Sequence, residues 1–163
     1  MGIEHLYTLT VKWTGNIGAD TPDYLAYERS HVISATGKPE ISGSSDPHFL
    51  GDRSKYNPEE LFLSSLSSCH MLWFLHLCSD KKILIVEYVD NPEGIMVTNH
   101  SGAGRFINVT LNPTITLRDN HTPLSALEEI HYMAHQRCFI ANSVNFPIKI
   151  KLKIMHKTQQ KNL

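Results

Sequence analysis

The stretch NPEELFLSSLSSCHM, residues 57–71, predicts a long helix around which the rest of this chain is arranged. Asn57 is a favourable N-cap residue, Pro58 suits the first helical position, and Glu60 completes a capping box with Asn57. The apolar run continues to about Asp80. Because the predicted helix is apolar nearly all round, we expect it to be buried at the centre of the fold.

The residues on either side of this helix predict strands and one further helix. Alternation of apolar and polar residues, or enrichment in β-branched residues, predicts strands at 5–13, 24–34, 83–90, 94–100, 106–117 and 148–154. Residues 35–56 are rich in glycine, proline, serine and aspartate, which predicts a long loop. A second helix starts at Thr122 and Pro123, and its apolar stripe runs over Leu124, Leu127, Ile130 or His131, Ala134 and Cys138. This order favours an α+β fold with antiparallel sheets, as a single domain of residues 1–163.

Composition and charge exclude several classes of protein. The net charge is −1 over 163 residues, with no long run of one sign, so nothing predicts binding to nucleic acid or to an anionic membrane. The longest apolar stretch, Leu61 to Cys78, carries four serines and two histidines, which argues against a membrane span. The N-terminal residues lack the pattern of a signal peptide, and three cysteines do not form a disulfide scaffold. We expect a cytoplasmic protein.

The three cysteines differ in their surroundings. Taken alone, Cys69 and Cys138 are each predicted to be a small apolar residue packed in the core. Polar residues follow both of them, however: His70 follows Cys69, and Asn142 with Ser143 follows Cys138. Cys78 lies nine residues beyond Cys69, on about the opposite side of the same helix, so we expect it to be inert packing.

Two spaced motifs carry a resemblance to a known family. NPEELFLSSLSSCHM at 57–71 and AHQRCFIANSVNFPI at 134–148 resemble the osmotically inducible protein C and organic hydroperoxide resistance superfamily (OsmC/Ohr). That family opens its central helix with Asn-Pro-Glu and has a cysteine ten residues after the glutamate, as Glu59 and Cys69 are spaced here. Its second cysteine follows Ala-His-x-x, as Cys138 does. The match spans essentially the whole chain, in a less characterised branch.

The resemblance implies a thiol-dependent peroxidase that reduces organic hydroperoxides, in a homodimer of intertwined α+β subunits. By that resemblance Cys69 is the peroxidatic cysteine, which becomes a sulfenic acid, and Cys138 is the resolving cysteine, which closes a disulfide with it. An external dithiol, lipoyl-type in the family, reopens the disulfide. The resemblance implies no metal and no bound organic cofactor.

Cys69 needs a cation nearby, because a buried thiol otherwise stays protonated. The family uses an arginine held by the motif glutamate, which places Glu59 in that role, although an acid in a first helical turn also stabilises the helix dipole. For the arginine we favour Arg29, on a predicted strand, over Arg53 in the loop. One family branch has its arginine just before a phenylalanine, and His48 stands at that position here.

Helix geometry limits how Glu59 can act on Cys69. Ten residues of straight helix separate the two by about 15 Å, which a single guanidinium does not bridge. Either the helix breaks between them or a second chain supplies the glutamate and arginine, and we favour the second chain.

Three further expectations concern ligands. Trp73, with Phe49 and Leu50 from the loop, could line an apolar substrate pocket, although such residues more often lie in a core. His131, His135 and Cys138 have a spacing that could hold a metal, but we expect no metal site. Because a fold does not fix a function, a non-catalytic protein that binds or senses an apolar ligand remains the alternative to the peroxidase.

Overall fold

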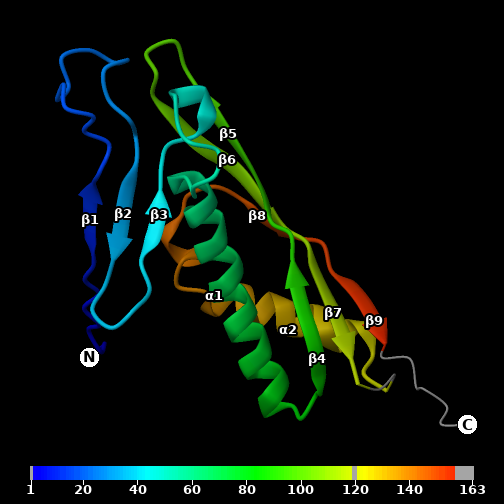
Figure 1. Ribbon diagram of the computed structural model, residues 1–163. Coiled ribbons are helices and arrows are strands. Elements are labelled where there is room, and N and C mark those ends of the chain that lie inside the picture. Colours follow the sequence, from blue (N-terminus) through cyan, green and yellow to red (C-terminus); the bar gives the residue numbers. More distant parts are fainter. Residues whose placement is uncertain (1, 119–120, 157–163) are drawn as a thin grey trace, which may run out of the picture. The chain divides into compact units, whose positions relative to one another are not determined.

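A computed structural model gives the structure of the chain, and it describes residues 2–118 and 121–156 (Figure 1). The chain divides into two compact units, Met1–Phe62 and Leu63–Leu163. Each unit is described by itself below. The expectation of a single domain stays a prediction.

The N-terminal unit contains a three-stranded antiparallel sheet in the order β1-β2-β3 (Figure 1). The strands are β1 (Thr10–Trp13), β2 (His31–Ser34) and β3 (Ile41–Gly43). The predicted hairpin of 5–13 with 24–34 is therefore correct in pairing but too long. Thr10 pairs with Ser34, after which the chain turns at Gly37 with φ of 75°, so residues 5–9 have no partner strand among the described residues. The predicted loop 35–56 was wrong in one respect, because it contains β3 and a 3₁₀ turn at Pro47–Phe49.

The long helix α1 runs from Pro58 to Asp80 without a break, as the sequence predicts. Its start is a reciprocal capping box: the Glu60 backbone N–H donates to Asn57 Oδ1 at 2.8 Å, and the Asn57 N–H donates to Glu60 Oε2 at 3.0 Å. One side of the helix is buried within the chain. Its buried residues are Leu66, His70, Phe74, Leu77 and Cys78. Other positions, such as Leu72, remain exposed, so the expected all-round burial is not reached within one chain.

The C-terminal unit holds two three-stranded sheets and the helix α2 (Leu124–Arg137). One sheet has the order β4-β7-β9 and the other β5-β6-β8. The strands are β4 (Ile85–Asp90), β5 (Glu93–Thr98), β6 (Gly104–Leu111), β7 (Pro113–Leu117), β8 (Ile148–Ile150) and β9 (Lys153–His156).

Two long predicted strands are each divided between these sheets. The segment 106–117 breaks at Asn112, because Pro113 has no N–H for a ladder bond and the Asn112 N–H donates to Asp90 Oδ1 at 2.6 Å instead. The segment 148–154 breaks at 151–152, so that β8 stays beside β6 and β9 stays beside β7. A sequence pattern gives the length of an extended run, but not the point where it changes sheet.

The expectation of antiparallel sheets holds for most pairs but not for all. β4 with β7 and β5 with β6 are antiparallel, whereas β6 with β8 and β7 with β9 are parallel. The parallel pairs arise because α2 lies between β7 and β8 in the chain, and a helical crossover returns the chain in the same direction. The class is α+β with mainly antiparallel pairing.

The core of the C-terminal unit forms between α1, α2 and the β4-β7-β9 sheet. Its buried residues are Phe74, Leu77, Cys78, Ile115, Leu117, Leu127, Ile130 and Ala134. Among the described residues, α1 is long and apolar enough to cross a bilayer by length and composition, a test that the core helix of a soluble protein also passes. Three residues of α1 belong to this core, so packing explains part of its apolar character.

Candidate functional site

Two cysteine thiols from different helices meet in the C-terminal unit. Cys69 lies on α1 and is half-buried, whereas Cys138 is 1% exposed. Burial and a hydrogen bond with the Cys69 thiol raise the pKa of Cys138 to about 11. Cys138 therefore keeps its proton at neutral pH and is the natural donor in this hydrogen bond. The structure brings together two sulfur atoms that lie 69 residues apart in the sequence.

Cys138 stands just after α2 and not deep within it, which corrects the expectation from the helical stripe. Its backbone is extended (φ −68°, ψ 110°), and its N–H donates to the His135 carbonyl. The chain then turns back through a 3₁₀ turn at Ala141–Ser143, and the Ala141 N–H donates to Cys138 Sγ at 3.3 Å.

An aromatic cluster adjoins the thiol pair in sequence and in space. Trp73 lies one helical turn beyond Cys69 on α1, and Phe139 follows Cys138 directly. The two rings meet edge to face, with centroids 5.8 Å apart and an interplanar angle of 80°. The Arg137 guanidinium carbon lies over the Trp73 ring, 5.6 Å from its centroid. Trp73 thus lies near the thiol pair, and its predicted role in lining a substrate pocket stays a prediction. Its contacts with Arg137 and Phe139 were not foreseen.

A buried histidine pair lies one residue along α1 from Cys69. His70 Nε2 and His131 Nδ1 are 2.8 Å apart, and the two rings stack at 10°. Burial, followed by the charge of His135, lowers the pKa of His70 to about 4. Burial, followed by the charge of His70, lowers the pKa of His131 to about 3. Both rings are therefore neutral at pH 7.

The residues with metal-binding spacing are not arranged as a metal site. His131 points its Nδ1 at His70, so it is not directed at His135 and Cys138 jointly. Within residues 2–118 and 121–156, no three side chains of His, Cys, Asp or Glu are grouped so that they could hold a metal ion. Only His131 and His135 share the helix α2, because Cys138 stands after its end. The side of α2 that carries His131 packs against α1.

Cys78 belongs to the core and not to the thiol pair. It is fully buried beside Phe74 and Leu77, and burial raises its pKa to about 12. A thiol so strongly protonated is a poor nucleophile at neutral pH.

Arg29, in the N-terminal unit, is held firmly although it does not lie on a strand as predicted. It precedes β2, and its guanidinium carbon lies between the rings of Tyr24 and Tyr27, 4.2 and 4.3 Å from their centroids. Its two terminal nitrogens donate to the carbonyls of the same two tyrosines. Its Nε is buried and has no partner among the described residues. The side chain is therefore fixed by stacking, with one donor left over.

Other predicted residues of the N-terminal unit lie near Arg29. Leu50 and Arg29 line one cavity of about 220 Å³, and the Phe49 carbonyl accepts a hydrogen bond from Tyr24 Oη at 3.2 Å. Glu59 Oε2 is buried without a partner among the described residues, and no ion pair joins Glu59 to Arg29 there. Arg53, the alternative, is exposed. The structure groups Arg29, Phe49 and Leu50, while Glu59 is not paired with either arginine.

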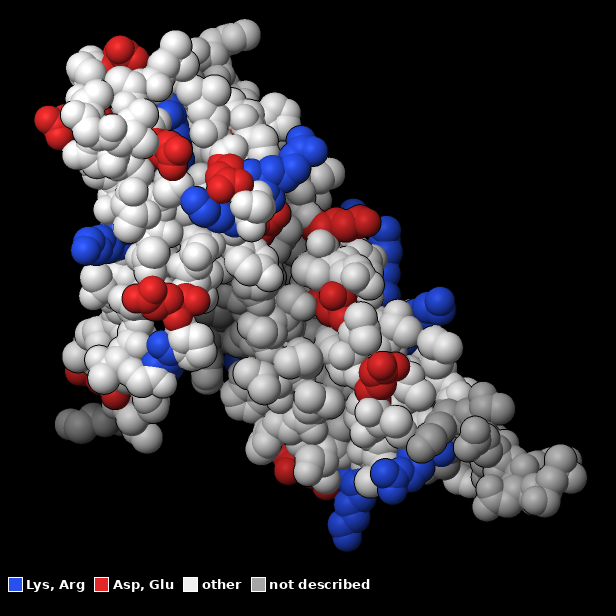
Figure 2. Space-filling view, viewed as in Figure 1, with Lys and Arg blue, Asp and Glu red and all other residues white. Residues whose placement is uncertain are grey.

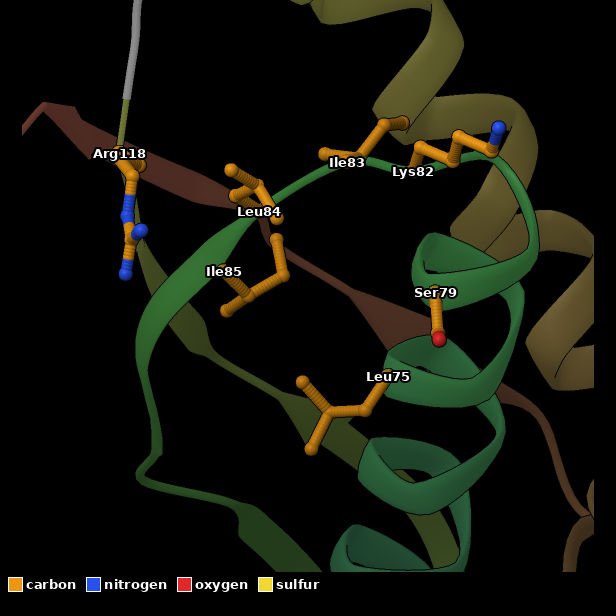
Figure 3. A pocket seen from close by; sticks show the side chains of 7 residues that line it. All are labelled: Leu75, Ser79, Lys82, Ile83, Leu84, Ile85 and Arg118. Atoms are coloured by element: carbon orange, nitrogen blue, oxygen red, sulfur yellow. The ribbon is translucent and has the colours of Figure 1, made fainter.

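A separate cavity of about 410 Å³ lies at the turn from α1 to β4 (Figure 3). Its lining is Leu75, Ser79, Lys82, Ile83, Leu84, Ile85 and Arg118. None of these is a cysteine, and none belongs to the predicted site. The chemistry of the thiol pair, rather than cavity volume, identifies the candidate site.

Charged side chains do not gather into a basic surface on the face shown in Figure 2. Lysine and arginine alternate there with aspartate and glutamate, and wide uncharged areas separate them over the described residues. This agrees with the balanced composition of 15 basic and 16 acidic residues. No polyanion is suggested as a ligand by this face.

Two neighbours of the thiol pair were missed by sequence reasoning. Phe139 follows Cys138 and Arg137 precedes it, so position in the sequence was the available signal. That signal is weak, because a residue next to a cysteine on a helix points about 100° away from it. Only the packing of α1 against α2 shows which of them reach the same place.

Comparisons with known proteins agree with the fold and the motifs. The family model described as OsmC-like protein matches residues 51–153. An OsmC-like protein of unknown function from Vibrio cholerae O1 biovar eltor str. N16961 has 33% identity and a TM-score of 0.82, covering 91% of this chain and 99% of that one. A search of curated proteins found no match.

More distant solved structures share the fold. An OsmC-like protein from Mycoplasma pneumoniae has 17% identity and a TM-score of 0.72, over 94% of this chain and 100% of that one. An organic hydroperoxide resistance protein from Elizabethkingia anophelis has 20% identity and a TM-score of 0.66, over 95% of this chain and 100% of that one. The resemblance seen in the sequence is confirmed, as is the fold class. Because the family model matches residues 51–153 and a relative with 33% identity covers 91% of this chain, this chain belongs to the OsmC-like protein family.

Proposed function

We propose that this protein is a thiol-dependent peroxidase that reduces organic hydroperoxides to alcohols. The observation that carries the proposal is the hydrogen bond between the thiols of Cys69 and Cys138. Family membership supports it at a coarser level, since some structural relatives are named organic hydroperoxide resistance proteins. The relative with the highest identity among those described above has no stated function, so the chemistry rests on the residues of this chain.

The reaction has three steps, each balanced within the groups named. The Cys69 thiolate attacks an oxygen of the hydroperoxide, the O–O bond breaks, and the leaving alkoxide takes a proton to become an alcohol. Cys69 is thereby oxidised to a sulfenic acid. The Cys138 sulfur then attacks the Cys69 sulfur, an S–S bond forms, the S–O bond breaks, and water leaves. An external dithiol reduces this disulfide and is itself oxidised to a disulfide.

The two cysteines differ in a way that supports these roles. Cys69 is half-buried and is the less enclosed of the two residues, whereas Cys138 is buried and keeps its proton. In a hydrogen-bonded pair, the group with the strongly raised pKa donates and its partner accepts. Cys69 is therefore the better candidate for the attacking thiolate and Cys138 for the resolving thiol.

Activation of Cys69 would come from Glu59 and Arg29 of a second copy of the chain, in a homodimer. The unbroken helix α1 removes the alternative of a helix that breaks between Glu59 and Cys69. Glu59 Oε2 and Arg29 Nε each lack a hydrogen-bond partner among the described residues. Each atom is therefore available to bond with a group of a second subunit. Exposed apolar residues, among them Val11 on β1 and Val97 on β5, are the kind of surface that a subunit contact covers.

The proposal is tested by following disulfide formation in the reduced protein. An organic hydroperoxide is added, and the Cys69–Cys138 disulfide is measured by mass spectrometry after alkylation of the remaining thiols. We expect rapid oxidation in the native chain, none in Cys69→Ser, and a trapped sulfenic acid on Cys69 in Cys138→Ser. Cys78→Ser is the matched control on the same helix and keeps the native rate, because Cys78 is buried in the core.

The opposite result supports a different function. Oxidation of Cys69 no faster than that of a free cysteine in solution would mean that the thiols are structural. The protein would then bind or sense an apolar ligand without turnover. We propose that the native reductant is a dithiol, of the lipoyl type by family resemblance. We also propose that the protein works in the cytoplasm, where thiols are kept reduced.

A further inference from the structure

The aromatic cluster beside the thiol pair offers an apolar surface to a ligand. Phe139 is 67% exposed and Leu72 62% exposed, although both are large apolar residues. Trp73, Leu72 and His76 line a shallow cavity of about 220 Å³. Trp73 stands one turn of α1 beyond Cys69, a rise of about 6 Å along the helix axis. A substrate that reacts at Cys69 can therefore touch this apolar surface with the rest of its chain.

A cation without a partner carboxylate lies at the edge of this surface. The Arg137 guanidinium carbon is 5.6 Å from the Trp73 centroid, and Arg137 forms no ion pair with any residue in 2–118 or 121–156. Asp80, an acidic residue on α1, is engaged by His76 at 3.6 Å. An arginine that lies over an aromatic ring keeps its outward N–H groups free for an anion.

Position in the chain ties Arg137 to the thiols. It immediately precedes Cys138, where α2 ends, and its guanidinium lies over the Trp73 ring. Trp73 stands one turn of α1 beyond Cys69, so the order along this surface is sulfur, aromatic ring, cation. A ligand that matches it has a reactive group, an apolar chain and an anionic group, in that order.

We propose that Arg137 is a specificity-determining residue that favours hydroperoxides with an anionic carboxylate at the far end of an apolar chain. This inference rests on the proposed peroxidase function. The chain of the substrate lies against Trp73 and Phe139, the hydroperoxide meets Cys69, and the carboxylate meets Arg137. Arg137 takes no part in the O–O cleavage, so its removal lowers the reduction of anionic hydroperoxides more than that of neutral ones.

The test compares two substrates that differ only in charge. Initial rates at low substrate give kcat/KM for ω-hydroperoxydecanoate and for its methyl ester, in the native protein and in Arg137→Gln. Because Arg137 is exposed, we expect its charge to favour the acid over the ester by about three- to five-fold at low ionic strength. High salt should reduce this preference, since exposed charges are screened.

The variants are chosen to separate charge from structure. Arg137→Gln should lower kcat/KM for the acid more than for the ester and so remove the preference for the acid. Arg137→Lys should keep part of the preference, and Arg137→Glu should invert it. Arg105→Gln removes an exposed arginine from β6 in the same unit and should change neither substrate. Equal loss for acid and ester in Arg137→Gln, or no loss for either, would overturn the inference.

A binding measurement separates the failure of this inference from the failure of the proposed function. Calorimetric titration with decanoate and with decanamide needs no reaction at Cys69. If neither hydroperoxide is reduced, the peroxidase proposal fails, but tighter binding of decanoate that is lost in Arg137→Gln still supports an anion-binding role for Arg137. Equal binding of decanoate and decanamide overturns that role whatever the rates show.

Discussion

Nε2 of His70 and Nδ1 of His131 share one hydrogen bond of 2.8 Å in the interior of the C-terminal unit. Phe74 stacks on the His131 ring with centroids 4.1 Å apart, so the pair is enclosed by hydrocarbon on that side. The outer nitrogens, His70 Nδ1 and His131 Nε2, are buried with no partner among the described residues. An added proton would place a charge where neither water nor a carboxylate compensates it, and the pair therefore resists protonation.

The first prediction concerns stability against pH. The pKa values of His70 and His131 fall from 6.5 to about 4 and about 3, so on acidification the unfolded chain binds protons first. The free energy of unfolding should then decline as the pH falls below about 6.5, by up to about 1.4 kcal/mol per pH unit for each histidine, and level off below both folded pKa values. Urea unfolding at a series of pH values measures this slope.

The control for this prediction is a histidine substitution on the surface. His131→Gln should reduce the slope between pH 6.5 and 4, because fewer buried imidazoles then resist protonation. His100→Gln, at an exposed position in the same unit, should leave the slope unchanged. A native profile that is flat over this range would contradict the assignment of the pair as neutral and buried.

The second prediction uses two leucines on α2 that differ in burial. Leu127 is fully buried in the core, whereas Leu124 is 54% exposed at the start of the helix. Leu127→Ala should lower the free energy of unfolding by about 2–5 kcal/mol, through lost burial and the cavity it leaves. Leu124→Ala removes the same atoms from the same helix and should cost less than about 0.5 kcal/mol. Chemical denaturation measures both, and equal effects would refute the packing of this face.

The third prediction concerns the start of α1. Asn57 is 7% exposed, and its Oδ1 accepts from the Glu60 N–H at 2.8 Å. Asn57→Ala should cost about 1 kcal/mol, because that N–H loses its partner, and Asn57→Ser should recover most of it. Thermal unfolding measures the differences. If Asn57→Ser were as unstable as Asn57→Ala, the effect would not be due to capping.

The fourth prediction concerns the coupling of the two thiols. The pKa of Cys138 is raised to about 11 by burial first, and then by its hydrogen bond with Cys69 and by the charge on Cys69. Cys69→Ala removes the last two causes, so the pKa of Cys138 should fall while staying above its ordinary value of 9.0. The pH dependence of alkylation at Cys138 reports this shift. Cys78→Ala should leave it unchanged, and a shift of equal size there would point to general loosening of the core.

Local sequence patterns predicted those helices and strands that are determined by residues close together in the sequence. The bounds of α1 followed from Asn57, Pro58 and Glu60, because capping is decided by neighbouring residues and is satisfied within the first turn. The strands were located with less precision. The break at Asn112 and the parallel pairing of β6 with β8 depend on which sheet each half joins, and no local pattern encodes that choice.

For the candidate site, too, the sequence predicted some residues, whereas only the structure showed their contacts. Resemblance drew attention to Cys69 and Cys138, but their hydrogen bond exists only because α1 and α2 pack together. The support of Arg29 by Tyr24 and Tyr27 was not foreseen, since the sequence suggested a strand there. Nothing in the sequence marked Arg137 as a neighbour of Trp73.

The sequence by itself determined the long capped helix, the α+β class and the family, because each depends on the order and spacing of residues along the chain. Only the tertiary structure decided which side chains share a site, since contacts between α1 and α2 join residues more than sixty positions apart. Burial is likewise a property of the packed chain. It sets the raised pKa of Cys138 and the lowered pKa values of His70 and His131, because the cost of charging a group depends on the atoms that surround it.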